Sequence, residues 1–279
     1  MEPKLPIPGG EDLPAAAVTA PGKARRARPA RPARQEAALS SLPLAKTWFI
    51  FRREVAAYFL SPAAYAVMAV YLLICGYFFS VSLIASQAAE MRGALGNMGI
   101  TFLFMAPILT MRLLAEERRQ GTDELLLTSP LSVGAIVAGK YLAVTAVYAL
   151  ILTITGIYPV IISIFGDPDA GPIITGYIGL FLLGASFLAV GVFASSVTDN
   201  QMVAGVVGFG ILLLLWIFSW AGDALANDLG RALQAVSILN RFDDFRKGIL
   251  DLANVLFYLS YIFGFLFLAV RMVEKRRWS

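Results

Sequence analysis

Long apolar stretches alternate with short polar segments along most of the chain. One stretch extends from Val55 to Ala89 without a charged residue, and a membrane-spanning helix needs only about 20 apolar residues. Because the lipid interior offers the backbone no hydrogen-bond partners, such stretches are expected to be helices. The pattern predicts an all-α membrane protein with about six transmembrane helices, at residues 62–83, 95–114, 133–165, 173–197, 201–220 and 252–270.

Most of the polar interruptions are short enough to be turns, as at Glu90 and Arg92 or at residues 167–169. Pro159 is expected to kink the third span near its far end, because proline has no backbone N–H to donate. Residues 221–251 form a longer stretch of mixed polarity. We expect short helices there that dip back into the membrane, and the sequence leaves open whether they gate the outer end of the bundle or only cover it.

Small residues are frequent in the fourth and fifth predicted spans, and they favour close contact between helices. The glycines are Gly176, Gly179, Gly184, Gly191, Gly205, Gly208 and Gly210. Trp216 and Trp220 are predicted to lie at the outer headgroup level, where indole rings are common.

Residues 44–59, ahead of the first span, are predicted to form an interfacial helix along the membrane surface. Large apolar residues recur there at helical spacing: Leu44, Trp48, Phe51 and Val55. Lys46 and Arg53 lie together on another face, and Glu54 follows Arg53. The pair Ser61-Pro62 predicts an N-cap and a first-turn proline for the first span.

Residues 1–43 are basic and rich in Pro, Ala and Arg, so they cannot bury a core and are predicted to be a disordered arm. No apolar stretch of the signal-peptide kind follows the basic residues. A solvated tail is the simpler interpretation, and contact with anionic lipid headgroups is the alternative. Residues 44–279 are predicted to be a single membrane domain.

Basic residues are distributed unevenly between the two ends of the predicted bundle. The arm, Arg118-Arg119 and Lys275-Arg276-Arg277 fall on one side if the chain crosses six times. By the positive-inside rule, this side and both termini are predicted to be cytoplasmic.

Composition excludes several kinds of chemistry. The chain is 58% hydrophobic and 15% charged, with no histidine and a single cysteine, Cys75. A Ser-His-Asp or His-metal hydrolase is excluded, as is a disulfide framework, and we predict no catalytic, cofactor-binding or metal-binding residue on this chain. The predicted spans lack Asp, Glu and Arg at mid-membrane, which argues against an ion-coupled carrier.

Residues 112–130 are the most informative segment. The second span is predicted to continue as a charged helix that ends near Arg118 and Arg119, with Gly121 just beyond it. Thr122 can cap a new short helix before Ser129-Pro130 stops it. The unit also contains the acidic residues Glu116, Glu117, Asp123 and Glu124 and the apolar residue Leu125. Such a unit can seat in a groove on a cytoplasmic partner, and an ordinary charged loop is the alternative.

The window Gly134–Tyr141 nearly matches a phosphate-binding loop, with Gly139-Lys140 in place. The motif needs Ser or Thr where this chain has Tyr141, and a strand before the loop. We interpret Gly139 as a packing residue and Lys140 as a side chain that extends to the cytoplasmic surface. Nucleotide hydrolysis is therefore not expected on this chain.

Three motifs resemble those of type-2 ABC transporter permeases, also called the ABC-2 type. The first is Glu116-Glu117-Arg118-Arg119-Gln120-Gly121-Thr122, followed by leucines and Ser129-Pro130. The other two are Arg53-Glu54-x-x-x-Tyr58-Phe59-x-Ser61-Pro62 and Phe193-Ala194-Ser195-Ser196-Val197-Thr198-x-Asn200-Gln201, which are nearest the gliding-motility-like branch. The resemblance covers residue 44 to the end of the chain.

The resemblance implies a permease subunit in the bacterial inner membrane. Cytoplasmic ABC ATPase subunits, on separate chains, would bind ATP and Mg²⁺, and a second permease copy or a related permease would complete the pathway. Residues 116–119 and 121–125 would form the ATPase-coupling segment, including a cytoplasmic coupling helix, and Trp48, Phe51, Arg53 and Glu54 would give a second contact. The lipid bilayer is the other expected partner, and no nucleic acid is expected.

One alternative is a membrane scaffold or force-transmitting subunit of an ABC-like motility or envelope complex that moves no solute. The sequence identifies neither the cargo nor the direction of transport, and homodimer and heterodimer remain equally open.

Overall fold

The computed structural model describes residues 43–86, 90–121, 132–224, 230, 234 and 237–277. Within this part the chain is helical and has no strand. Its helices are α2 (Pro43–Leu60), α3 (Pro62–Ser86), α4 (Arg92–Thr110), α5 (Arg112–Arg119), α7 (Val133–Thr155), α8 (Ile157–Phe165), α9 (Ala170–Val197), α10 (Gln201–Ala224), α12 (Ile238–Arg246) and α13 (Leu252–Arg277). The predicted arm lies outside the described residues except for Pro43, where α2 begins.

In the described part of the chain, six helices or helix pairs are long and apolar enough to cross a membrane, and they match the six predicted spans. They cover Pro62–Ser86, Arg92–Arg119, Val133–Phe165, Ala170–Val197, Gln201–Gly222 and Leu252–Lys275. The chain is therefore an all-α, multi-pass membrane protein, as predicted.

Two of the spans are composite, each for a local reason. Pro159 cannot donate to the carbonyl oxygen of Thr155, and the third span breaks there, at Gly156 between α7 and α8. This interruption lies within one turn of Pro159, where the kink was predicted. In the second span, the N–H of Met111 still donates to the Pro107 carbonyl oxygen at 2.8 Å. Met111, the one residue between α4 and the charged α5, also has helical backbone angles (φ −55°, ψ −29°), so the span continues into α5 as predicted.

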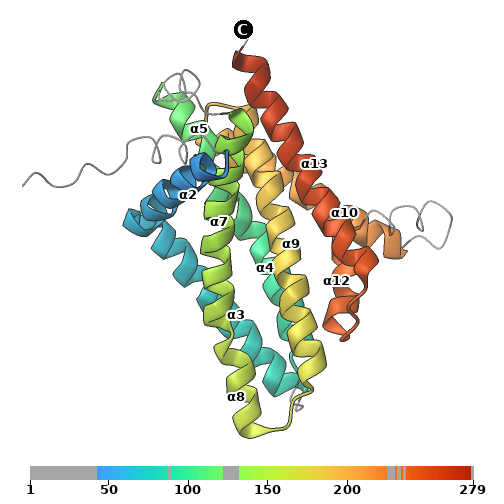
Figure 1. The fold of residues 1–279 in the computed structure, drawn as a ribbon. Coiled ribbons are helices and arrows are strands. Elements are labelled where there is room, and N and C mark those ends of the chain that lie inside the picture. Colours follow the sequence, from blue (N-terminus) through green and yellow to red (C-terminus); the bar gives the residue numbers. More distant parts are fainter. Residues whose placement is uncertain are drawn as a thin grey trace, which may run out of the picture.

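α9 is the central helix, with α4, α7, α10, α12 and α13 packed around it (Figure 1). Most of its membrane-crossing length is buried. At four glycines an added methyl group would collide with a side chain of a neighbouring helix: Gly176 with Leu95, Gly179 with Phe245, Gly184 with Tyr148 and Gly191 with Thr110. Close packing at these positions is confirmed, whereas Gly210 on α10 faces open space.

The described part of the 221–251 stretch includes the predicted short helix, α12. It packs on α9, α10 and α4, with Phe242 and Phe245 buried. Thr175 of α9 donates to the Phe245 carbonyl oxygen at 2.7 Å, and Tyr258 of α13 donates to that of Ile238 at 2.6 Å. α12 is thus bonded to two spans, toward the end of the bundle opposite α2 and α5 (Figure 1); a gating role remains a prediction.

Candidate functional site

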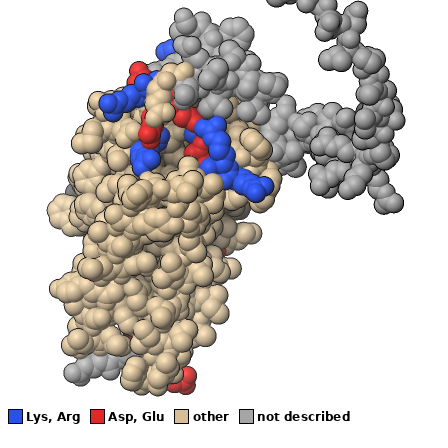
Figure 2. Space-filling view, turned by 90° about the vertical axis from the view of Figure 1, so that its left-hand side faces the viewer, with Lys and Arg blue, Asp and Glu red and all other residues tan. Residues whose placement is uncertain are grey.

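A hollow lies where α2, the first turns of α3, the end of α4, α5 and α7 meet. Its volume is about 310 Å³, and its lining is charged on one side and apolar on the other. Figure 2 shows Lys, Arg, Asp and Glu side chains gathered around it at one end of the molecule, above a face that is otherwise almost free of charge. Three basic side chains (Arg53, Arg112, Lys140) and three acidic ones (Glu54, Glu116, Glu117) line it.

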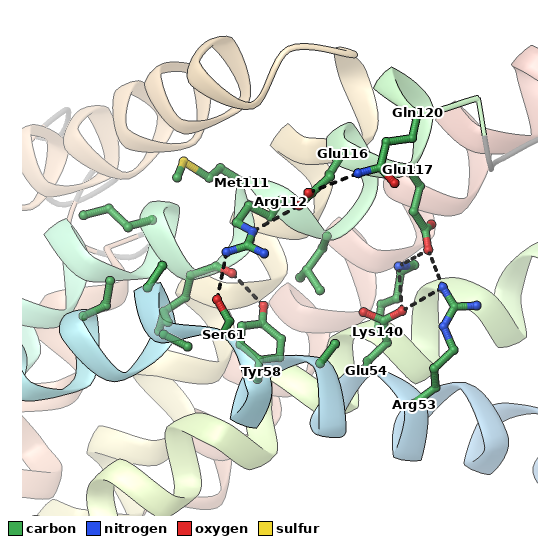
Figure 3. Close-up of a pocket in the computed structure, with 17 residues that line it drawn as sticks. Arg53, Glu54, Tyr58, Ser61, Met111, Arg112, Glu116, Glu117, Gln120 and Lys140 are labelled. Carbon is green, nitrogen blue, oxygen red and sulfur yellow. Dashed lines mark hydrogen bonds and ion pairs between the residues drawn. The ribbon is translucent and has the colours of Figure 1, made fainter.

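Lys140 is the best buried of these charges, with only 2% of its side chain exposed. Its Nζ atom donates to Oε1 of Glu117 at 2.8 Å and to Oε1 of Glu54 at 3.1 Å. Arg53 Nη2 reaches the same Glu117 oxygen at 3.3 Å (Figure 3). A single ammonium group thus joins α7 to α2 and α5. We call Arg53, Glu54, Glu117 and Lys140 the clamp.

This geometry corrects the interpretation of Lys140 as a side chain that extends to the surface. The first reason is steric: Gly139 packs against Ile50 and the Thr47 carbonyl oxygen, so α2 covers this part of α7. The second is electrostatic, since two carboxylates compensate the ammonium group for its loss of water. Gly139 itself is a packing residue, as predicted.

A second group of polar contacts surrounds Arg112, next to the clamp. Arg112 Nε donates to Oε2 of Glu116 at 3.1 Å, and Arg112 Nη1 donates to Ser61 Oγ at 3.2 Å (Figure 3). Gln120 Nε2 donates to the other Glu116 oxygen at 3.3 Å. These contacts bring α5 next to the junction between α2 and α3.

Tyr58 connects α2 to the end of α4. Its hydroxyl donates to the Leu109 carbonyl oxygen at 2.7 Å. Burial raises the pKa of this hydroxyl well above its usual value, and the nearby Glu54 carboxylate adds to the effect. Tyr58 therefore remains a protonated donor at every physiological pH.

Ser195 of α9 holds the start of α5 from the opposite direction. Its hydroxyl oxygen accepts from the backbone N–H groups of Leu114 and Ala115 at 3.0 and 3.1 Å, and it donates to the Met111 carbonyl oxygen at 3.1 Å. Arg118 also approaches Asp199, beyond the end of α9, at 3.8 Å. Ser195 on α9 and Asp199 just beyond it thus contact the two ends of α5.

Among known families, residues 98–273 match the model of the ABC-2 family transporter protein, over more than half of the chain. The chain belongs to this family. It is an ABC-2 permease, and its six apolar helices make it a multi-pass membrane protein. The matched region begins within α4, so α2 and α3, which form one wall of the hollow, precede it. No curated protein matches the chain.

The structure describes some of the predicted coupling residues of this ABC-2 permease and not others. Glu116, Glu117 and Arg118 take part in the contacts above, whereas Arg119 is exposed. Gly121 follows α5 with φ of +66°, the left-handed conformation expected of a residue just past a helix. Thr122, Asp123, Glu124 and Leu125 lie outside the described residues, so the coupling helix itself stays a prediction.

The residues predicted for the interfacial helix face in different directions. Trp48 is 64% exposed and stacks on Phe51, with ring centroids 5.0 Å apart. Arg53 and Glu54 instead point into the hollow (Figure 3). The face that packs on α7 contains Ile50, which the pattern of large apolar residues had not singled out.

Sequence reasoning did not identify Lys140, Arg112 and Ser195 as residues of one site. A signal was nevertheless present, because residues of all three family-like motifs meet around α5. Arg53, Glu54, Tyr58 and Ser61 come from one, Glu116 and Glu117 from another, and Ser195 from the third. Within the described part of the chain, no group of three or more His, Cys, Asp or Glu side chains is placed to hold a metal ion.

Proposed function

We propose that this chain is the permease subunit of an ABC transporter, which forms the translocation pathway and is driven by ATP hydrolysis on separate cytoplasmic ATPase subunits. The observation that carries the proposal is the junction around α5 in a chain of the ABC-2 family. α5 follows the spanning helix α4 across the single residue Met111, whose backbone angles are helical. Its charged side chains contact α2 and α7, and its first backbone N–H groups donate to Ser195 of α9.

The mechanism that we infer uses α5 as a lever. A push on the segment after Gly121 would displace α5, and the displacement would pass directly into α4. Lys140 would transmit it to α7, and Arg112 would transmit it through Ser61 to the start of α3. Closure of two ATPase subunits on ATP and Mg²⁺ would supply the push, and hydrolysis would reset it. The contact would comprise Arg119, Gly121 and residues 122–125, and Trp48 of α2 would belong to a second contact.

The proposed assembly contains two permease copies, or this chain and a related permease, in the bacterial inner membrane with both termini in the cytoplasm. The motif likeness to the gliding-motility-like branch supports a place near that branch. The force-transmitting role remains the alternative function, and no observation on the structure favours it over transport.

The test is an affinity purification from native membranes with the full chain as bait. Arg119→Glu reverses an exposed charge on α5, and Gly121→Pro removes a residue that adopts φ of +66°, which proline cannot reach. Arg271→Glu on α13 is the matched control, since Arg271 is an exposed residue far along the chain from α5. We expect an ATPase subunit with the wild type and the control, and its loss with the two variants.

An ATPase that is retained by all three variants would place the contact elsewhere, and no ATPase under any mild detergent would contradict the proposal. Reconstitution of the purified complex in vesicles then separates the two functions. Solute movement that requires ATP supports transport, whereas ATPase activity without movement of any solute supports the force-transmitting role.

A further inference from the structure

The hollow has the position of a lipid headgroup site. Its polar wall carries the charges of α2, α5 and α7, and its apolar wall includes Ala64 and Val67 of α3 and Ile108 of α4. Figure 2 shows that it opens at the border between the charged end and the apolar face of the molecule. In a membrane protein this border is the depth at which phospholipid headgroups meet their acyl chains.

A stripe of exposed apolar side chains extends from the hollow along α4. Ile108 lines the hollow, and Phe104 and Ile100 follow at intervals of four residues on α4; all three are exposed on the surface of the bundle. Residues four apart lie on one helix face, so the stripe extends about 12 Å from Ile108 to Ile100 at 1.5 Å per residue. An acyl chain can lie along it while its headgroup occupies the hollow.

The charges of the hollow select the kind of headgroup. Its lining carries three basic and three acidic side chains. A headgroup with a net negative charge would leave an excess of negative charge among the carboxylates, whereas a zwitterion keeps the balance. The ligand should therefore carry one anionic and one cationic group.

The two ends of such a headgroup have separate partners. The Arg112 side chain is 43% exposed, and its Nη2 atom has no hydrogen bond to a described residue while Nε and Nη1 are engaged. Ser61 accepts from Arg112 and keeps its own hydroxyl proton to donate. Arg112 Nη2 and Ser61 Oγ are thus two donors suited to a phosphate.

Glu116 is the partner for the cationic end. Its side chain is 32% exposed, and each oxygen accepts one hydrogen bond, which leaves further lone pairs on both. A primary ammonium group has three N–H donors and can form charge-assisted hydrogen bonds with this carboxylate. A quaternary choline group has no N–H donor, so it gains much less here. We propose that the hollow binds a membrane phospholipid with a phosphoethanolamine headgroup.

The experiment measures lipid retention by native mass spectrometry. The full-length chain, purified and stripped of lipid, is incubated with equimolar phosphatidylethanolamine, phosphatidylcholine and phosphatidylglycerol that share the same acyl chains. We expect the ethanolamine lipid to be retained roughly tenfold more tightly than the choline lipid, the effect of about one charge-assisted hydrogen bond.

Substitutions test which residues bind the phosphate and which bind the ammonium group of the headgroup. Glu116→Gln is expected to lower retention of the ethanolamine lipid to about the choline level and to change retention of the choline lipid much less. Arg112→Gln is expected to lower retention of all three lipids, and Ser61→Ala, which removes only a hydroxyl, tests the phosphate end if Arg112→Gln does not fold. Arg271→Gln removes a comparable exposed guanidinium, paired with Glu274, and should change nothing.

Equal retention of the three lipids by the wild type would overturn the proposal, and so would preference for the anionic glycerol lipid. A Glu116→Gln variant that keeps the ethanolamine preference would do the same. The proposal does not depend on an ATPase partner, so it can fail or hold independently of the proposed function.

Discussion

Lys140→Met is the substitution that most directly tests the clamp. Methionine keeps an unbranched apolar side chain that can pack under α2, but it is one atom shorter and lacks the ammonium group. Glu54 and Glu117 then face each other without the cation between them. Arg53 remains within 3.3 Å of Glu117, but its side chain is 59% exposed and water weakens its effect.

The expected cost follows from the geometry. Both carboxylate oxygens lie within 3.1 Å of Nζ, so they are at most about 6 Å apart. At an effective dielectric constant of about 20, two like charges at this distance repel by about 3 kcal/mol. The carboxylates are only 13% and 14% exposed, and breaking a buried pair by removing one partner typically costs about 3–5 kcal/mol. We expect Lys140→Met to lower the free energy of unfolding by about 3 kcal/mol.

The assay is unfolding of the purified protein in mixed micelles, with a double-mutant cycle. Glu117→Gln in the Lys140→Met background removes the repulsion, so the double variant should recover at least about 1 kcal/mol relative to additive behaviour. Arg271→Met breaks an exposed pair on α13 and should cost less than about 1 kcal/mol. A coupling near zero, or a Lys140→Met variant no less stable than Arg271→Met, would refute the description of the clamp.

Two further predictions concern α9. Ser195→Ala leaves two backbone N–H groups of α5 without their Ser195 acceptor and should lower the free energy of unfolding by about 1–3 kcal/mol in the same assay. The control, Ser196→Ala, loses only a hydrogen bond to its own helix and should cost less. Equal costs would contradict the capping role of Ser195. Gly191→Ala places a methyl group within 2.8 Å of the Thr110 Cβ atom and should lower stability by about 1–3 kcal/mol. The control, Gly210→Ala, meets open space and should be neutral or slightly stabilising. Thermal unfolding compares the two variants, and a Gly191→Ala variant as stable as the wild type would show that this contact is loose.

The spans and their ends were predictable because the signals are local. Ser132 caps α7 through a hydrogen bond from the Ala135 N–H, three residues away. Pro159 breaks the third span within one helical turn, and Gly121 follows directly on the charged α5. In each case the residues that decide the structure are neighbours in the sequence, where helix-capping rules apply.

The site was less predictable because its contacts join distant residues. Lys140 and Glu54 are 86 positions apart, and Ser195 lies 81 positions from Leu114. Nothing near Lys140 in the sequence shows that α2 covers it, so a lysine at the start of a span was assigned its usual exposed position. Only the packing of α2 on α7, through Gly139 and Ile50, reverses that expectation.

The central position of α9 has a consequence for how the chain is made. During synthesis α9 enters the membrane before α10, α12 and α13, which later cover one side of it. Until they arrive, the faces of α9 at Gly179 and Ala194, which α12 and Gly208 of α10 contact, are open to lipid. We therefore expect the nascent chain to pass through an intermediate with an incomplete bundle, and premature release at that stage to yield a substrate for membrane quality-control proteases.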